Sequence, residues 1–481
     1  MSNSATASRD QASPSLVDLN PYLNGIFAPV SAETTLVDCK VIGEIPRDLH
    51  GAYCRNGPNP ANTPIDLHHW FDGDGMIHGV YFENGKAEYR NRYIRTDDLK
   101  AELAGTLDAG GVLLPANPAR GEKVYKDTAN TDLVFHNGAL MALWYISGTP
   151  VRVDARTLET IRDEDFGGAL PRCVSAHGKT DTKTGEFAFF DYSLHQPWMS
   201  YGIVGKDNVL KNFQRVELPG ARLPHDMGLT ENYVILHDLP VVFSEAGRRK
   251  NLWRIESQDR GARFGVAPRN GLGADIKWFE VEPCYIYHVV NAWEDGDEVV
   301  MHACKMVPNG LKPNPSYGPY APMAVVLALH AVPVEWRMNM RTGAVRSRQL
   351  DDRLGEFPAI NNEFNGRKGR YSYNVSLDPG ETLRFDGFHK YNLETGAADT
   401  YKFAPGVFGS EGAFAPRIGA KDEDDGYLVT FTTEENTGAS EVQVLNAKDI
   451  AAGPIARVVL PCRVPAGFHA TWAPGSEIGA R

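Results

Sequence analysis

Apolar and polar residues alternate with a period of two along most of this 481-residue chain, which is the pattern of half-buried β-strands. Short turns rich in glycine, asparagine and aspartate separate the alternating segments. Asn84-Gly85 and Asn137-Gly138 each divide a pair of such segments, over residues 80–94 and 132–146. Both dipeptides favour the two-residue type I′ turn, so each pair of segments predicts a β-hairpin.

Similar turn signals recur along the chain, at residues 183–185, 294–297, 341–343, 394–396 and 424–426. A loose repeat of strand, Asp or Asn turn and strand accompanies them. Antiparallel sheets repeated around an axis, a β-propeller, account for a repeat spread over the whole chain. A pair of β-sandwich domains is the alternative. Helix is scarce, and residues 99–107 are the best short candidate.

The chain is expected to form a single all-β domain over residues 16–481, because no linker-like segment divides it. Residues 1–15 are polar and are expected to form a disordered tail. The composition, 42% hydrophobic and 23% charged, supports a large core and excludes wholesale disorder.

The charge and cysteine patterns narrow the class of partner and the compartment. A net charge of −12 without a block of Lys and Arg argues against a nucleic-acid partner. The six scattered cysteines fit reduced thiols, and no secretory signal is visible, so a cytoplasmic location is expected. Residues 99–118 are apolar with few charges, and they predict a peripheral membrane contact, with packing on the propeller as the alternative. Nothing indicates an obligate protein partner.

Common catalytic motifs are missing from the sequence. It contains no phosphate-binding Walker loop, no nucleophile elbow and no dinucleotide fingerprint. The Asp-Gly-Asp-Gly of residues 72–75 faintly resembles a calcium loop but lacks the later oxygen ligands, so a turn is the better interpretation.

Four of the 14 histidines lie in apolar or aromatic surroundings next to turns: His177, His225, His288 and His469. They are far apart in sequence, but the inner strand of each propeller blade starts near the axis, where such residues can converge. Four neutral imidazoles suit Fe(II), Co(II), Zn(II) or Cu(II) by ligand softness. On octahedral iron they would leave two adjacent positions open, as O₂ chemistry requires. The other histidines, including His68 and His69, are interpreted as core or surface residues.

Several motifs in order along nearly the whole chain resemble the carotenoid cleavage oxygenases, among them RNGPNP (55–60), PHDMGLTENYVIL (224–236), SEGAFAPR (410–417) and GFHATWAP (467–474). The resemblance implies a seven-bladed β-propeller with an axial metal site and a dome of loops over a substrate tunnel. It also implies one Fe(2+) ion per chain, O₂ as co-substrate, and His177, His225, His288 and His469 as the iron ligands.

Members of this family hold three of the four histidines through glutamates, which fix each ring and its tautomer. Glu356 and Glu411 match two of these positions by resemblance. The third position departs from the family pattern, because Tyr145 stands where relatives carry glutamate. Either the Tyr145 hydroxyl replaces the missing carboxylate, or one imidazole uses water or backbone.

The predicted activity is oxidative cleavage of one C=C bond of a small hydrophobic conjugated alkene by O₂, which gives two carbonyl products. Phenol-cleaving relatives resemble one another in a lysine where this chain has Trp144. This difference favours an apocarotenoid, with a stilbenoid or phenylpropanoid as the alternative. Aromatic residues suit a flat polyene, and five are predicted tunnel walls, although each also fits a plain core role: Phe71, Trp144, Tyr125, Phe135 and Trp198.

Two hypotheses from other classes are weighed against the dioxygenase. A calcium-dependent propeller hydrolase would need axial carboxylate and amide oxygens in place of four histidines. A non-catalytic iron-binding or interaction propeller would show no turnover on any alkene or ester.

Overall fold

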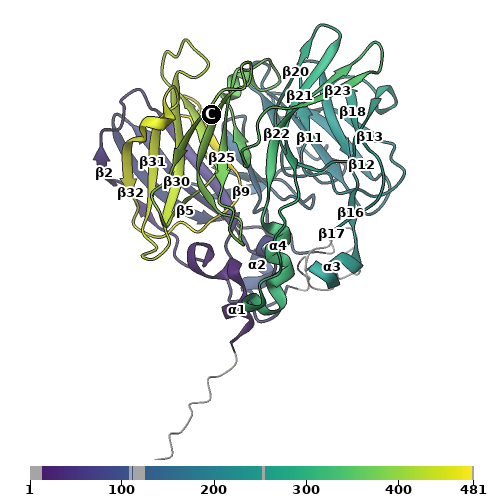
Figure 1. Ribbon diagram of the computed structural model, residues 1–481. Helices are drawn as coiled ribbons and strands as arrows, with labels where there is room; N and C mark the ends of the chain where they lie inside the picture. The colour runs from purple at the N-terminus through teal and green to yellow at the C-terminus, as the bar shows by residue number, and fades with distance from the viewer. Residues whose placement is uncertain (1–13, 108–110, 112–124, 252–254, 479–481) are drawn as a thin grey trace, which may run out of the picture.

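Seven antiparallel sheets are arranged around one axis in the computed structural model, which describes residues 14–107, 111, 125–251 and 255–478 (Figure 1). The fold is therefore the seven-bladed β-propeller that was expected, and the pair of β-sandwiches is excluded. The predicted tail, residues 1–15, lies outside the described residues as far as residue 13. Ser15 is described, and its side chain caps helix α1 (Leu16–Leu19).

The blades follow one another in chain order, and the strands of each blade succeed one another from the axis outward. The first blade contains β33 (Ala470–Pro474), β3 (Gly51–Pro58), β4 (Gly75–Glu83), β5 (Lys86–Tyr93) and β1 (Thr35–Leu36). The second contains β6 (Asp132–His136), β7 (Ala139–Leu143), β8 (Val151–Val153) and β9 (Thr160–Asp163). The third contains β10 (Lys179–Asp181), β11 (Glu186–Tyr192), β12 (Met199–Val204) and β13 (Leu210–Val216).

The remaining blades repeat this plan. The fourth contains β14 (Gly228–Leu229), β15 (Tyr233–Asp238), β18 (Ala262–Pro268) and β19 (Lys277–Val281). The fifth contains β20 (Ile286–Asp295), β21 (Glu298–Met306), β22 (Ala331–Asn339) and β23 (Val345–Gln349). The sixth contains β24 (Gly355–Ala359), β25 (Tyr371–Leu377), β26 (Phe385–Asn392) and β27 (Ala398–Lys402). The seventh contains β29 (Ala413–Pro416), β30 (Gly426–Glu434), β31 (Ser440–Asn446), β32 (Pro454–Val459) and β2 (Lys40–Gly43), and β28 (Val407–Gly409) also pairs with β30.

Two pairings between the ends of the chain close the ring. The C-terminal strand β33 pairs with β3 from Gly51↔Pro474 to Arg55↔Ala470, and the N-terminal strand β2 pairs with β32. Because each of these blades combines strands from both ends of the chain, neither blade is complete until both ends are in place.

Burial follows the position of a strand within its blade. All eight residues of β3 and all six of β12 are buried, because these strands lie between neighbouring blades. The outermost β23, with sequence VRSRQ, is mostly exposed. Charged side chains on such an edge discourage pairing with another chain.

The turn predictions are confirmed. Asn84 and Gly85 join β4 to β5 with φ angles of 52° and 76°, and Asn137 and Gly138 join β6 to β7 with 50° and 71°. Two successive positive φ angles define the type I′ turn. The five later turns also lie between antiparallel neighbours of one blade.

The helix expected over residues 99–107 is shifted. Helix α2 spans Asp97–Leu103, because Thr96 caps it by accepting the N–H of Leu99 and two aspartates stabilise its first turn. Gly105, with φ of 69°, follows its end. Leu99 is buried and Leu103 is 53% exposed. Half of the predicted membrane segment, residues 108–110 and 112–118, lies outside the described residues, so that contact stays a prediction.

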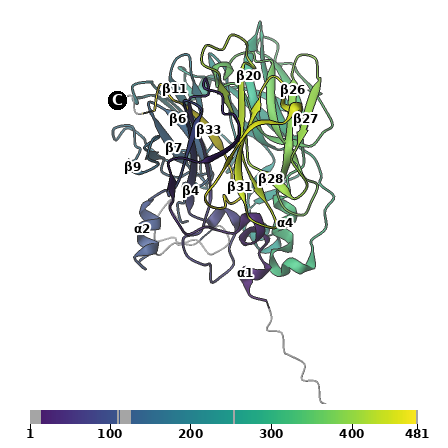
Figure 2. The same cartoon turned by 90° about the vertical axis from the view of Figure 1, so that its left-hand side faces the viewer.

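The α-helices of the described residues lie together on one face of the propeller: α1, α2, α3 (Glu245–Asn251) and α4 (Ala321–Leu327) (Figures 1 and 2). A ribbon of β16 (Val241–Phe243) and β17 (Ile255–Ser257) flanks α3. Short 3₁₀ helices are η1 (Pro21–Leu23), η2 (Gly25–Phe27), η3 (Trp70–Asp72), η5 (Gly273–Asp275), η6 (Pro315–Tyr320), η7 (Asn362–Phe364) and η8 (Ile450–Ala452). Strand direction identifies this face as the one at which the inner strands begin. Within the ranges described, no helix is long and apolar enough to cross a membrane.

Candidate metal centre

The seven inner strands run in the same direction, so the residues at their starts gather at one level of the axis. Each strand contributes one imidazole or carboxylate there. The set is Asp132 of β6, His177 before β10, His225 before β14, His288 of β20, Glu356 of β24, Glu411 before β29 and His469 before β33. A ring closed by seven blades thus collects four imidazoles and three carboxylates.

The four predicted histidines contact one another. The ring centroids of His177 lie 4.6 Å from His225, 5.1 Å from His288 and 4.5 Å from His469. His288 lies 5.0 Å from His225 and 4.7 Å from His469. One nitrogen from each of His177, His288 and His469 falls within 4.8 Å of the others. His225 completes the cluster through its ring contacts.

Hydrogen bonds on the outer side fix three of the rings. His288 Nδ1 contacts the Glu356 carboxylate, and His469 Nδ1 lies 3.2 Å from Glu411 Oε1. His225 Nδ1 lies 2.9 Å from the Tyr287 carbonyl oxygen. Since a carbonyl and a carboxylate accept, each Nδ1 donates, and each Nε2 is the unprotonated nitrogen that a metal ion requires.

The inward nitrogens fit a metal ion. Nε2 of His177 and of His288 is buried without a hydrogen-bond partner among the described residues. Burial lowers the pKa of both rings well below the usual value and lowers that of His225 to about 3. Burial alone would lower the pKa of His469, but Glu411, together with Asp132 and Asp226, outweighs burial and raises it. Neutral imidazoles aimed at one point suit Fe(II) and its neighbours in the first transition row.

Both glutamates that hold a histidine are buried. Glu356 is completely buried, and burial raises its pKa well above the usual value. Its Oε2 also accepts the N–H of Phe357 at 2.6 Å. Glu411 is 7% exposed, and it holds His469 from the neighbouring blade. Each carboxylate therefore ties its own inner strand to the histidine of another blade.

Tyr145 lies beside the cluster, with its ring centroid 5.6 Å from that of His225. The Nδ1 of His225 is nevertheless bonded to the Tyr287 backbone, and the backbone carbonyl of Tyr145 accepts the Tyr192 hydroxyl. The geometry favours the Tyr287 backbone carbonyl over the Tyr145 hydroxyl as the partner of His225. The role of Tyr145 stays a prediction.

The predicted tunnel residues lie in separate parts of the structure. Phe71 packs at 5.3 Å from Tyr145 and 4.6 Å from Phe468, next to the cluster. Trp144 and Tyr125 line a second, mainly apolar cavity with Ile146 and others. The structure therefore brings Phe71 to the histidines through Tyr145, and it brings Trp144 and Tyr125 to each other.

Of the other two aromatic candidates, Phe135 lines the axial cavity that His177 and His469 also line, and Trp198 lies apart from it. Phe135 stands on β6 three residues beyond Asp132, about 10 Å along the strand at roughly 3.3 Å per residue. Trp198 is half-buried against the main core. Neither Phe135 nor Trp198 contacts a histidine of the cluster.

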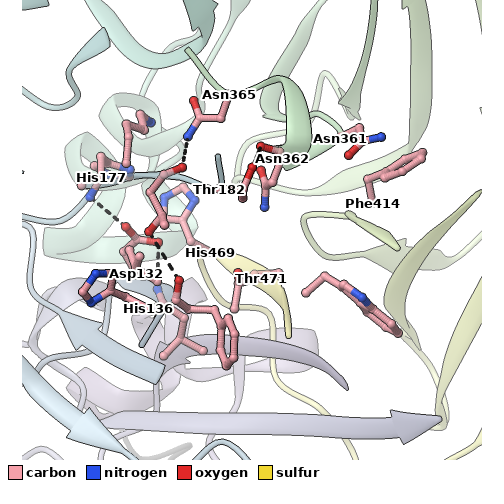
Figure 3. A pocket seen from close by; sticks show the side chains of 18 of the residues that line it. Asp132, His136, His177, Thr182, Asn361, Asn362, Asn365, Phe414, His469 and Thr471 are labelled. Carbon is pink, nitrogen blue, oxygen red and sulfur yellow. Dashed lines mark hydrogen bonds between the residues drawn. The ribbon is translucent and has the colours of Figure 1, made fainter. Parts of the chain in front are cut away.

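A cavity of about 420 Å³ extends along the axis from the histidines (Figure 3). His177 and His469 lie at it together with Asp132, and its walls carry polar side chains such as Thr182 and Asn362. Apolar side chains such as Phe135, Phe414 and Trp472 line the same cavity, so its character is mixed.

Two other histidines and three residues that the sequence did not indicate lie around the site. His68 and His69 are buried outside the cluster, and His69 Nδ1 accepts the N–H of Phe71. Sequence reasoning did not single out Asp132, Asp226 or Phe357. Asp132 begins the strand before the Asn137-Gly138 turn, and Asp226 follows His225. Both therefore lie beside features that the sequence predicts. Phe357 stacks on His469 with centroids 4.8 Å apart.

The fold and the site define a β-propeller with four histidines clustered on its axis, three of which could hold one metal ion. The chain belongs to the family described as retinal pigment epithelial membrane protein, which matches residues 27–474.

Individual relatives extend over nearly the whole length. A carotenoid 9,10(9',10')-cleavage dioxygenase of Crocus sativus is 37% identical, over 93% of this chain and 88% of the relative. The isoeugenol monooxygenase of Pseudomonas nitroreducens is 30% identical, over 95% and 98%. The crystal structure of Pseudomonas brassicacearum lignostilbene dioxygenase superposes with a TM-score of 0.84 at 28% identity, over 95% and 99%.

Proposed function

We propose that this chain is a dioxygenase that cleaves one C=C bond of an apocarotenoid-type polyene with O₂ at a four-histidine Fe(2+) centre. The reaction class, oxidative cleavage of a C=C bond, follows from family membership and from the histidine site. The identity of the metal and of the substrate goes beyond the reaction class and is what we propose.

The convergence of four imidazoles carries the proposal. His177, His225, His288 and His469 would hold the iron, and iron bound there supplies the site at which O₂ is activated beside the alkene. The protein's own part is to keep the imidazoles neutral and fixed. Burial keeps His177, His225 and His288 deprotonated, and Glu356 and Glu411 orient two of the rings.

The apolar surroundings support a polyene substrate. Trp144 is 4% exposed, and its carbonyl accepts the N–H of Ala176, the residue before His177. An indole at this place can stack on a conjugated chain, whereas it cannot take up the charge of a phenolate. Phe71 and Tyr125 add further apolar surface that excludes water.

A phenolic stilbenoid is the second candidate, supported by the structural likeness to the lignostilbene dioxygenase. Lys126 follows Tyr125 in the sequence and is the cation beside that predicted tunnel residue that would recognise a phenol. Its ammonium group is already paired with Asp74 at 2.6 Å and with Glu102, and its side chain is only 11% exposed. These ion pairs count against a phenol-binding role.

A comparison of two substrates on one iron-loaded preparation tests the substrate. We expect kcat/KM for an apocarotenal to exceed that for resveratrol or lignostilbene. Trp144→Lys should lower the ratio of the two values, and the matched control Trp144→Phe, which keeps an aromatic face, should preserve it. A parent enzyme that prefers a hydroxystilbene by about tenfold, or about 1.4 kcal/mol of transition-state stabilisation, would refute the polyene assignment.

A further inference from the structure

We propose that Asp132 is a positioning residue of the metal centre, which orients His177 through a hydrogen bond to the backbone of that histidine. This inference rests on the proposed function, because it treats the histidine cluster as the metal site. It assigns a role to a carboxylate that neither the sequence motifs nor the family pattern singled out.

The Asp132 side chain accepts two backbone N–H groups. Its Oδ2 accepts from His177 at 2.8 Å, and its Oδ1 accepts from Leu133 at 2.7 Å. The residue is 7% exposed and lines the axial cavity beside His177 and His469 (Figure 3). Both carboxylate oxygens are thus engaged, and the second bond fixes the orientation in which the first is made.

His177 depends on this contact more than the other histidines do. His225, His288 and His469 are each held through Nδ1 by a carbonyl or a carboxylate. Across the part of the chain that the structure describes, the ring of His177 makes no hydrogen bond of this kind, and its Nε2 is buried without a partner. Apart from the packing of its ring against the other histidines, its orientation therefore depends on its backbone.

The backbone of His177 adopts a conformation that needs support. Its φ angle is +71°, in the left-handed region that side chains other than glycine rarely adopt. Such a conformation persists only where the surroundings hold it. The charge-assisted bond from the His177 N–H to Asp132 is a direct restraint on the peptide that carries the imidazole.

The segment that carries Asp132 also holds a second histidine. The N–H of His469 donates to the Thr131 carbonyl oxygen at 3.2 Å. Asn130 anchors the segment by donating to the carbonyls of Phe71 at 2.9 Å and Gly73 at 2.7 Å. Residues 130–132 therefore connect the backbones of two histidines to the first blade, and Asp132 is the charged part of that connection.

The test measures Co²⁺ binding to the metal-free full chain, together with the visible absorption of the Co²⁺ form and the thermal midpoint of the metal-free form. Asp132→Ala removes both bonds. It should weaken Co²⁺ affinity by about 10-fold or more, as is usual when a partner that orients a ligand is lost, and it should change the Co²⁺ spectrum.

Asp181→Asn is the matched control. Asp181 is buried at the other end of β10, accepts the N–H of Lys183 at 3.0 Å and pairs with Arg269 and Arg367. Its replacement should lower the thermal midpoint, with Co²⁺ affinity within about twofold of the parent, well below the usual loss for a ligand-orienting partner.

A folded Asp132→Ala protein that keeps the parent's Co²⁺ spectrum and a Co²⁺ affinity within about twofold of the parent's would overturn the inference. The loss of a partner that orients a ligand usually weakens metal binding by more than that. If Asp132→Ala does not fold, Asp132→Asn decides. Its single carbonyl oxygen leaves one of the two N–H groups facing an amide donor, so weaker binding is expected and parental binding overturns the inference. A parent protein that binds no Co²⁺ or Fe²⁺ refutes the proposed function itself, whereas a metal-binding parent with an unaffected variant refutes the role of Asp132 alone.

Discussion

Replacing Glu356 with glutamine tests whether the buried carboxylates support the metal centre. In the parent, the Glu356 carboxylate contacts His288 Nδ1 and accepts the Phe357 N–H at 2.6 Å, in a completely buried position. Glutamine keeps the shape but removes the charge that Glu356 carries once a bound cation offsets the effect of burial on its pKa. A charge-assisted hydrogen bond is worth about 1.5–3 kcal/mol and a neutral one about 0.5–1.5 kcal/mol. The loss of about 1–1.5 kcal/mol predicts a roughly tenfold weaker iron affinity.

The assay is a competition titration of metal-free protein with a chelator, accompanied by kcat/KM on the polyene. Glu335→Gln is the matched control, because Glu335 forms another histidine–carboxylate pair, 3.0 Å from His302 Nε2, outside the metal centre. That variant should leave iron affinity unchanged. If Glu356→Gln binds iron as tightly as the parent, or if Glu335→Gln weakens iron equally, the carboxylate does not act by orienting a ligand.

Two further predictions follow from the same geometry. Tyr145→Phe should leave iron affinity within about twofold, since His225 already donates to the Tyr287 carbonyl; a tenfold loss in the same titration would show that the hydroxyl takes part. The metal-free protein should lose stability in urea denaturation as the pH falls from 7 to 5. Burial lowers the pKa of His177, His225 and His288 when folded, whereas in the unfolded chain they bind protons below about 6.5. The raised pKa values of His469 and Glu356 act in the opposite direction, which leaves three groups against two, so a stability that rises as the pH falls would contradict the neutral burial of the three histidines.

The turn residues made the hairpins of the blades predictable from the sequence. The pairing of strands from distant parts of the chain was not predictable. Asn-Gly turns impose two positive φ angles, so the hairpins at Asn84 and Asn137 could be placed. The number of blades came only from the resemblance, because the repeat itself is too degenerate to count. The pairing of β33 with β3 joins residues from opposite ends of the chain, and no local pattern records it.

The candidate site likewise contains residues that the sequence could predict and contacts that it could not. The histidines stood out by their apolar surroundings next to turns, and the propeller geometry explains how they meet. The backbone partner of His225 could not be predicted, because a carbonyl such as that of Tyr287 leaves no trace in residue type. The place of Asp132 before a predicted hairpin turn does not disclose its partner, because a neighbouring blade brings the His177 N–H to it across a separation of 45 residues.

The most direct test of the four-histidine centre is O₂-dependent cleavage of an apocarotenal by single histidine variants, with products identified by mass. The parent and His68→Ala should yield two carbonyl products and retain iron. His177→Ala, His225→Ala, His288→Ala and His469→Ala should each lose iron or cleavage, because the cluster is then incomplete. Full iron content and turnover in two or more of these four variants would contradict the assignment.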